Sequence, residues 1–361
     1  MQMRGGYAVW AMLLLGCSTE DPVQVVEDDA AAADVVTPGP MGDGGSVAQD
    51  VGVDAGRDSG AVAVDAGSTV RDVPVVMGDA GVSPTLGGCP LFPPDNLWNR
   101  DVSADALHPQ SAQIMANIQA HGDNRMLRAD FGRNPAYGLP YVIVPESQAR
   151  VPITYTEYGD ESDPGPFPIP LNAPIEGGND DHVLVLQQGA CRLFELYHAR
   201  RAGSGWAAGS GATFDLRSNR LRPEGWTSTD QAGLAVLPGL IRYDEIQAGV
   251  IRHAIRVTFD HTQDAWVHPA THPGGNRDST APPMGLRLRL RASYNIAAFR
   301  GSARVILEAL KRYGLMVADT GYNWYMSGAT DTRWNDTELE TLRQVPGSAF
   351  EVVNTGPFRR R

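Results

Sequence analysis

The fold is decided by the stretch His182-Val-Leu-Val-Leu-Gln-Gln-Gly-Ala-Cys-Arg-Leu-Phe-Glu-Leu-Tyr-His198. Two apolar-rich runs, 182–187 and 192–198, flank the turn at Gln188-Gly189, a pattern typical of a β-hairpin. A loop centred on this turn would place His182 directly opposite Glu195. Facing His and Glu side chains can tune each other's pKa, as acid–base catalysis requires. A cross-strand ion pair on a solvated face is the structural alternative.

Further strands are expected along the rest of the chain. Leu286, Leu288 and Leu290 alternate with arginines, which indicates a sheet with one buried face. Other short β-branched or aromatic runs lie at 141–144, 153–158, 251–259, 315–318, 323–326 and 350–353. Apolar spacing and capping residues predict helices over 111–121, after Ser302 and after Asn335. We therefore expect a mainly β domain with a few helices, as an antiparallel sandwich or open barrel with helices packed at its edges.

The N-terminus has the pattern of an export signal. Arg4 precedes an apolar run over 7–15, which is too short to span a bilayer. Leu14-Leu15-Gly16-Cys17 resembles the bacterial lipobox, cut just before its cysteine. The resemblance implies a signal peptide over 1–16, lipidation of Cys17, and a lipid-anchored protein at the outer membrane or cell surface, with the membrane as a partner. The alternative is an ordinary secretory signal with an incidental cysteine.

A linker follows the proposed anchor. Residues 18–88 contain thirteen Asp or Glu, two Arg and no aromatic residue. Such a composition buries too little apolar area to fold, so we expect 17–88 to be a disordered acidic tether. This segment accounts for most of the net charge of −12. Residues 89–361 are therefore nearly neutral and are expected to form one domain, with no nucleic acid among its partners.

The remaining cysteines suggest a covalent link. Cys89 and Cys191 form an even pair in a chain expected to be exported, which favours a disulfide. Two free buried thiols are the alternative. His268 and His272 are spaced for a metal only on a helix, and Pro269 and Pro273 indicate a loop instead. We expect neither a metal site nor a cofactor.

Carboxylates are the candidate catalytic groups. Glu195 lies within an apolar strand, where glutamate is uncommon. Asp244 and Glu245 are expected in a loop just before the strand that carries His253, an arrangement found in sugar-cleaving sites and in ordinary turns. His253 itself is expected to be a core histidine. The candidate catalytic set is therefore Glu195, His182, Asp244 and Glu245.

Aromatic residues in polar segments are candidate binding residues. Trp226 lies among Gly, Thr and Ser, and Tyr322, Asn323 and Trp324 are adjacent. Exposed rings beside amides and carboxylates can stack on and hydrogen-bond to a sugar. Burial of the tryptophans in the core is the alternative.

Several stretches resemble a family of secreted proteins of soil bacteria. They include Phe92-Pro-Pro-Asp-Asn-Leu-Trp-Asn99, Glu161-Ser-Asp-Pro-Gly-Pro-Phe-Pro-Ile-Pro170, 225–228 with 233–245, and 284–292. The resemblance implies export and a single domain, and it transfers no catalytic residue. Two hypotheses follow. The chain is a surface-tethered polysaccharide hydrolase that uses carboxylates, a glycoside hydrolase, or it is a non-catalytic lipoprotein that binds polysaccharide or cell wall. A hydrolase requires two carboxyl groups in one cleft.

Overall fold

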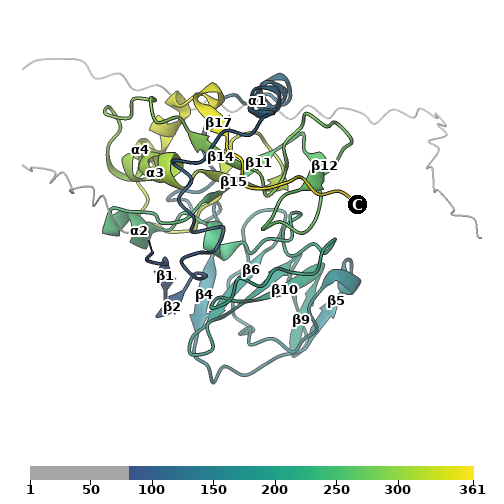
Figure 1. Cartoon of the computed structure of the whole chain (residues 1–361). Helices are drawn as coiled ribbons and strands as arrows, with labels where there is room; N and C mark the ends of the chain where they lie inside the picture. Colours follow the sequence, from purple (N-terminus) through teal and green to yellow (C-terminus); the bar gives the residue numbers. More distant parts are fainter. Residues whose placement is uncertain (1–80) are drawn as a thin grey trace, which may run out of the picture. The chain divides into compact units, whose positions relative to one another are not determined.

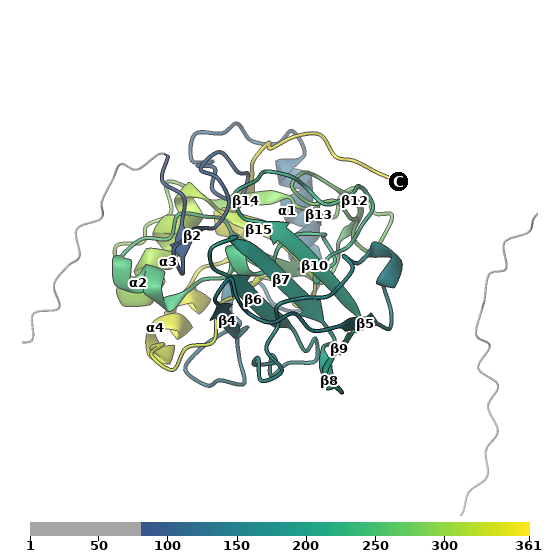
Figure 2. The same ribbon diagram turned by 90° about the horizontal axis from the view of Figure 1, so that it is seen from below.

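The computed structural model describes residues 81–361. The hairpin stretch forms the centre of a four-stranded sheet in the order β10-β7-β6-β4, of which Figure 1 labels β10, β6 and β4 and Figure 2 labels all four strands. The strands are β4 (Tyr141–Val144), β6 (Val183–Gln187), β7 (Arg192–Tyr197) and β10 (Ser210–Asp215). Successive side chains of β6 point to opposite faces, and every one of them is buried. This sheet is therefore covered on both sides.

A three-stranded sheet provides one of the two covers. It contains β5 (Ile153–Tyr155), β8 (Arg200–Ala202) and β9 (Gly205–Ala208), which lie beside the four-stranded sheet in Figure 2. Val183 and Val185 of β6 pack with Phe194 and Trp206 in a small core on this side. Leu184 and Leu186 belong to the larger core on the other side.

A six-stranded sheet is the second major layer. Its order is β17-β14-β15-β11-β16-β3. The strands are β3 (Arg128–Ala129), β11 (Ile255–Phe259), β14 (Arg287–Leu290), β15 (Leu315–Thr320), β16 (Tyr325–Met326) and β17 (Phe350–Val352). Leu286, Leu288 and Leu290 are all buried, as their alternation predicts. Arg287 is buried as well, and its guanidinium donates to the carbonyl of Tyr313 at 2.6 Å.

Helices pack beside the six-stranded sheet or, in the case of α2, against α3 (Figure 1). They are α1 (Ser111–Ala120), α2 (Tyr243–Ala248), α3 (Gly301–Arg312) and α4 (Asp336–Glu340), with short 3-10 turns at Gly159–Glu161, Leu237–Gly239, Thr341–Gln344 and Gly347–Ala349. Asn335 caps α4, because its side chain accepts hydrogen bonds from the N–H groups of Thr337 and Glu338. Ser302 lies within α3 and is not its cap. Helix α2 was not predicted from the sequence, which indicated a loop at Asp244 and Glu245.

Two small sheets and a disulfide complete the fold. β1 (Thr85–Leu86) pairs with β2 (Cys89–Pro90), so the described fold begins ahead of Cys89. β12 (Gln263–Trp266) pairs with β13 (Pro283–Met284). The predicted disulfide is confirmed: Cys89 is bonded to Cys191, 102 residues further along the chain. It ties β2 to the turn that precedes β7.

The expected fold class is confirmed, since the domain is mainly β with a few helices. The strand pairing is more mixed than the alternation suggested. β6 and β7 are antiparallel, but β4 pairs with β6 and β11 pairs with β15 in parallel. Parallel neighbours require long crossover connections. Such connections bring distant parts of the chain to one edge of each sheet.

Candidate functional site

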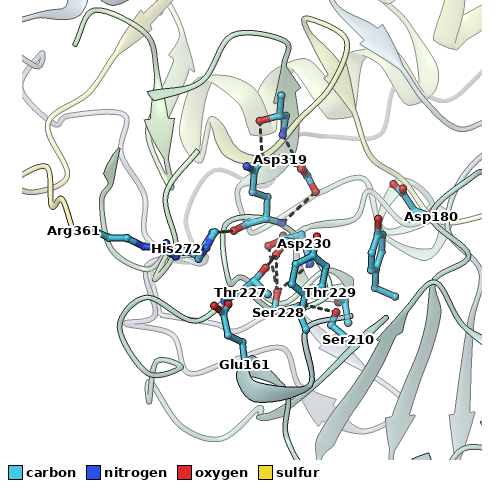
Figure 3. A pocket seen from close by; sticks show the side chains of 14 residues that line it. Glu161, Asp180, Ser210, Thr227, Ser228, Thr229, Asp230, His272, Asp319 and Arg361 are labelled. Atoms are coloured by element: carbon cyan, nitrogen blue, oxygen red, sulfur yellow. Dashed lines mark hydrogen bonds between the residues drawn. The ribbon is translucent and has the colours of Figure 1, made fainter. Parts of the chain in front are cut away.

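A polar cavity of about 550 Å³ lies where the ends of β7 and β15 approach the loop over 227–231 (Figure 3). We call it the Asp319 cavity. Carboxylates, hydroxyls and two tyrosine rings dominate its wall. The residues that carry the argument below are Glu161, Asp180, Tyr158, Tyr197, Asp230 and Asp319. None of these six is among the predicted site residues.

Asp319 is the carboxylate of this wall whose pKa is shifted from its ordinary value. It is half-buried near the end of β15, and its Oδ2 accepts a hydrogen bond from the N–H of Gln231 at 3.3 Å. Burial and the negative charge of Asp230 raise the pKa of Asp319 to about 6. A carboxyl group with such a pKa is partly protonated near neutral pH. It can therefore donate a proton, as a general acid must.

Asp230 lies behind Asp319 and is fully paired. One of its oxygens receives the guanidinium of Arg256, and the other accepts the N–H of Leu234 at 3.0 Å. The side chain of Asp230 is completely shielded from solvent. Asp230 is thus a structural neighbour whose charge acts on Asp319.

Asp180 and Tyr197 lie on the same part of the wall. Burial, followed by the charge of Asp180 and smaller contributions that include Asp319, raises the pKa of Tyr197 to about 12. Both carboxylates therefore act on one phenol, and Asp180 is exposed to solvent. The cavity thus carries two accessible carboxylates, Asp180 and Asp319, near one tyrosine.

Glu195 supports the cavity from behind. It is completely buried, and its carboxylate accepts hydrogen bonds from the N–H groups of Val236 and Leu237 and from the hydroxyl of Thr229, at 2.9–3.1 Å. Burial raises the pKa of Glu195 despite these hydrogen bonds. Glu195 was expected to be a catalytic carboxylate, but its complete burial leaves no surface for contact with a substrate. Glu195 fixes the loop that forms one wall.

His182 does not face Glu195. The hairpin pairs Gln187 with Arg192 and Leu184 with Glu195, which is two residues out of the predicted register. His182 Nδ1 instead lies 2.5 Å from Oε2 of Glu176, and its Nε2 lies 2.8 Å from the carbonyl oxygen of Thr229. Burial lowers the pKa of His182, but Glu176 outweighs it and raises this pKa to about 9. With an acceptor at each nitrogen, His182 is an imidazolium that holds Thr229.

Glu245 and Asp244 belong to a different place. They lie in α2 and not in a loop, because the segment closes a helical turn on Arg242. Glu245 is buried, with Oε1 2.8 Å from Nη2 of Arg242 and 3.1 Å from Nε2 of His253. Burial would raise the pKa of Glu245, but Arg242 and His253 hold it below its ordinary value. Neither carboxylate is part of the wall of the Asp319 cavity. The expectation that His253 is a core histidine is confirmed.

The predicted aromatic residues do not form one surface. Trp324 is fully buried against Phe259 and Phe350. Asn323 is buried and donates to the carbonyls of Ile118 and His121. Tyr322 is 77% exposed.

Trp226 is half-buried near the guanidinium of Arg222, 5.7 Å from the ring centroid. The prediction of a joint sugar-binding set is therefore wrong for Asn323 and Trp324, whose side chains serve the core.

Among residues 81–361, Arg361 is the one cation in the wall of the Asp319 cavity. His272 accepts the Arg361 guanidinium at Nε2, 2.7 Å away, and its Nδ1 lies 2.8 Å from the carbonyl of Gln231. Burial and Arg361 lower the pKa of His272, so the imidazole is neutral at pH 7. The accessible wall is thus acidic on balance.

Three further findings concern metal ligands, membrane-spanning helices and the predicted lipidation site. Within residues 81–361, no three His, Cys, Asp or Glu side chains are arranged to hold a metal ion. No helix in this part of the chain has the length and apolar character to cross a membrane. The predicted lipidation site Cys17 lies outside the described residues.

Comparison with known protein families, with curated proteins and with solved structures finds no match to this chain.

Proposed function

We propose that this protein is a polysaccharide hydrolase that uses Asp319 as its general acid and Asp180 as its second carboxylate. One observation carries the proposal: Asp319 is half-buried in a polar cavity and has a pKa of about 6, while a second, exposed carboxylate lies on the same wall. Glycoside hydrolysis requires two carboxyl groups in different states, one protonated and one ionised. The tyrosine rings of Tyr158 and Tyr197 offer faces for a sugar ring.

In this proposal, Asp319 donates its proton to the glycosidic oxygen as the bond to the sugar breaks. Asp180 stabilises the positive charge that develops on the sugar, or activates the attacking water. Asp230 does not touch the substrate, because its side chain is shielded. It keeps Asp319 protonated through its negative charge.

The test is release of reducing ends from xylan, mixed-linkage β-glucan and soluble starch. We expect the wild type to cleave at least one polymer, and Asp319→Asn and Asp180→Asn each to lower cleavage at least about 100-fold without unfolding. Asp160→Asn is the matched control, since Asp160 is exposed and outside the cavity wall. Cleavage by Asp319→Asn at a rate close to that of the wild type would contradict the proposal.

The alternative is a non-catalytic binding protein, which the exposed Tyr158 favours. Polymer binding without any release of reducing ends would support this alternative.

We also propose that the domain is exported and anchored through lipidated Cys17, from the lipobox pattern at 14–17. Metabolic labelling with a fatty acid should mark the wild type and not Cys17→Ser. Equal labelling of both would contradict the anchor.

A further inference from the structure

Exposed aromatic rings are rare on the described surface. Among residues 81–361, three aromatic side chains are exposed: Tyr158 at 48%, Tyr137 at 58% and Tyr322 at 77%. Tyr158 lines the Asp319 cavity. Tyr137 lines a second cavity of about 520 Å³. Tyr322 packs on Tyr325 of that second cavity, with 5.6 Å between ring centroids. Every exposed aromatic ring in this part of the chain therefore lies at one of two cavities.

The second cavity, which we call the Tyr137 cavity, combines rings with polar groups. Its wall contains Tyr137, Tyr325, Asp130, Asn134, Asp336 and Arg343. Within residues 81–361, the hydroxyl groups of Tyr137, Tyr322 and Tyr325 have no hydrogen-bond partner. Three phenols are thus available to a ligand.

Hydrogen bonds fix the backbone that carries two of these rings, those of Tyr137 and Tyr322. The N–H of Tyr137 donates to the carbonyl of Asn134 at 3.0 Å, and the carbonyl of Tyr137 accepts the hydroxyl of Thr330 at 3.3 Å. The carbonyl of Tyr322 accepts the hydroxyl of Thr258 at 2.6 Å. A ligand that stacks on them has little backbone ordering to overcome.

We propose that the Tyr137 cavity, together with Tyr322, is a second binding site for an uncharged polysaccharide. Tyrosine faces stack on the C–H face of a sugar ring, while phenol, amide and carboxylate groups bond to its hydroxyls. The class of ligand rests on the proposed function.

The chain itself connects the two cavities. Asp319 and Thr320 line the first cavity, Tyr322 follows two residues later, and Tyr325 lines the second. A polymer that occupies both sites gains affinity from a high effective concentration at the second site.

The charges of both cavities exclude an anionic polymer. Glu161, Asp180 and Asp319 face one cation, Arg361, in the first cavity. The acidic residues of the Tyr137 cavity, Asp130, Asp336 and Glu340, likewise outnumber its one cation, Arg343. A uronate or sulfated chain would be repelled at both sites.

The experiment measures polymer affinity by electrophoresis through gels that contain xylan, mixed-linkage β-glucan, soluble starch or polygalacturonate. The protein is the full chain with Asp319→Asn, so that the polymer is not consumed. We expect Tyr322→Ala and Tyr137→Ala each to weaken binding of a neutral polymer about three- to tenfold. Tyr322→Phe, which keeps the ring, should retain most of the affinity. Leu171→Ala is the control, since Leu171 is exposed and outside both cavity walls.

The outcomes separate this inference from the proposed function. Wild-type affinity in the double variant Tyr137→Ala and Tyr322→Ala, no binding of any neutral polymer, or equal binding of polygalacturonate would each overturn the second site. Ring-dependent binding, together with a wild type that releases no reducing ends from the bound polymer, supports the second site and rejects the hydrolase.

Discussion

Two carboxylates in this molecule have pKa values that are shifted in opposite directions. Glu245 in α2 is buried against Arg242 and His253, and its pKa is held below the ordinary value. Asp319 near the end of β15 is half-buried near another carboxylate, and its pKa is raised to about 6. The difference shows that the neighbours of a buried acid decide its role. Cation partners keep Glu245 ionised as a structural link, while burial and a neighbouring anion keep a proton on Asp319, whose side chain solvent still reaches.

The largest expected effect is on activity, which should depend on Asp319 and not on Glu245. Asp319→Asn should lower polymer hydrolysis about 10²- to 10⁴-fold, because the general acid is lost. Glu245→Gln should leave activity per folded molecule close to that of the wild type, since Glu245 is outside the cavity wall. Reducing-end assays on protein shown to be folded by circular dichroism measure both. Equal losses of activity in the two variants would contradict the different roles assigned to the two acids.

The free energy of unfolding should show the opposite dependence, because it should depend on Glu245. Glu245→Ala leaves the guanidinium of Arg242, which is 1% exposed, without its buried partner. We expect the free energy of unfolding in urea to fall by about 3–5 kcal/mol. Asp244→Ala is the matched control on the same helix. Its side chain is 48% exposed, so about 0–1 kcal/mol is expected. A Glu245→Ala variant no less stable than Asp244→Ala would show that the buried group is not a structural link.

A smaller effect concerns His182, which supports the wall of the Asp319 cavity. Its pKa is about 9 in the folded protein and 6.5 in the unfolded chain, so its contribution is fully present below about pH 6.5. It should be lost as pH rises through about 9, by no more than about 3 kcal/mol. The urea midpoint of the wild type should therefore fall over this window more than that of His182→Gln.

The matched control for His182 is His198→Gln, whose imidazole is partly exposed beside Glu157. His198→Gln should retain the pH dependence of the wild type. If the urea midpoints of wild type and His182→Gln depend on pH identically, His182 does not contribute to the pH dependence of stability.

Local patterns predicted much of the fold. The alternating leucines of β14, the apolar runs of β6 and β7 and the Asn335 cap are local signals, and the structure contains each of them. The six-residue helix α2 was missed because it is too short to display a helical period. The hairpin register was wrong by two residues, because the loop runs from Gln188 to Cys191 and is not centred on Gln188-Gly189.

The site was less predictable than the fold. Asp319 follows the apolar run 315–318, and a carboxylate at such a place is indistinguishable in sequence from an ordinary turn residue. Its raised pKa depends first on burial and then on Asp230, which is distant in the chain and is brought close by the loop that Glu195 holds. Glu195 attracted the prediction because a glutamate in an apolar strand is unusual. That anomaly indicated a buried structural role.

The central claim is that Asp319 donates the proton in hydrolysis. The most direct measurement is the pH dependence of kcat/KM on a cleaved neutral polymer. Because the acid must be protonated, kcat/KM should fall tenfold per pH unit above a pKa of about 6. A kcat/KM that stays constant from pH 5 to pH 8 would contradict the account.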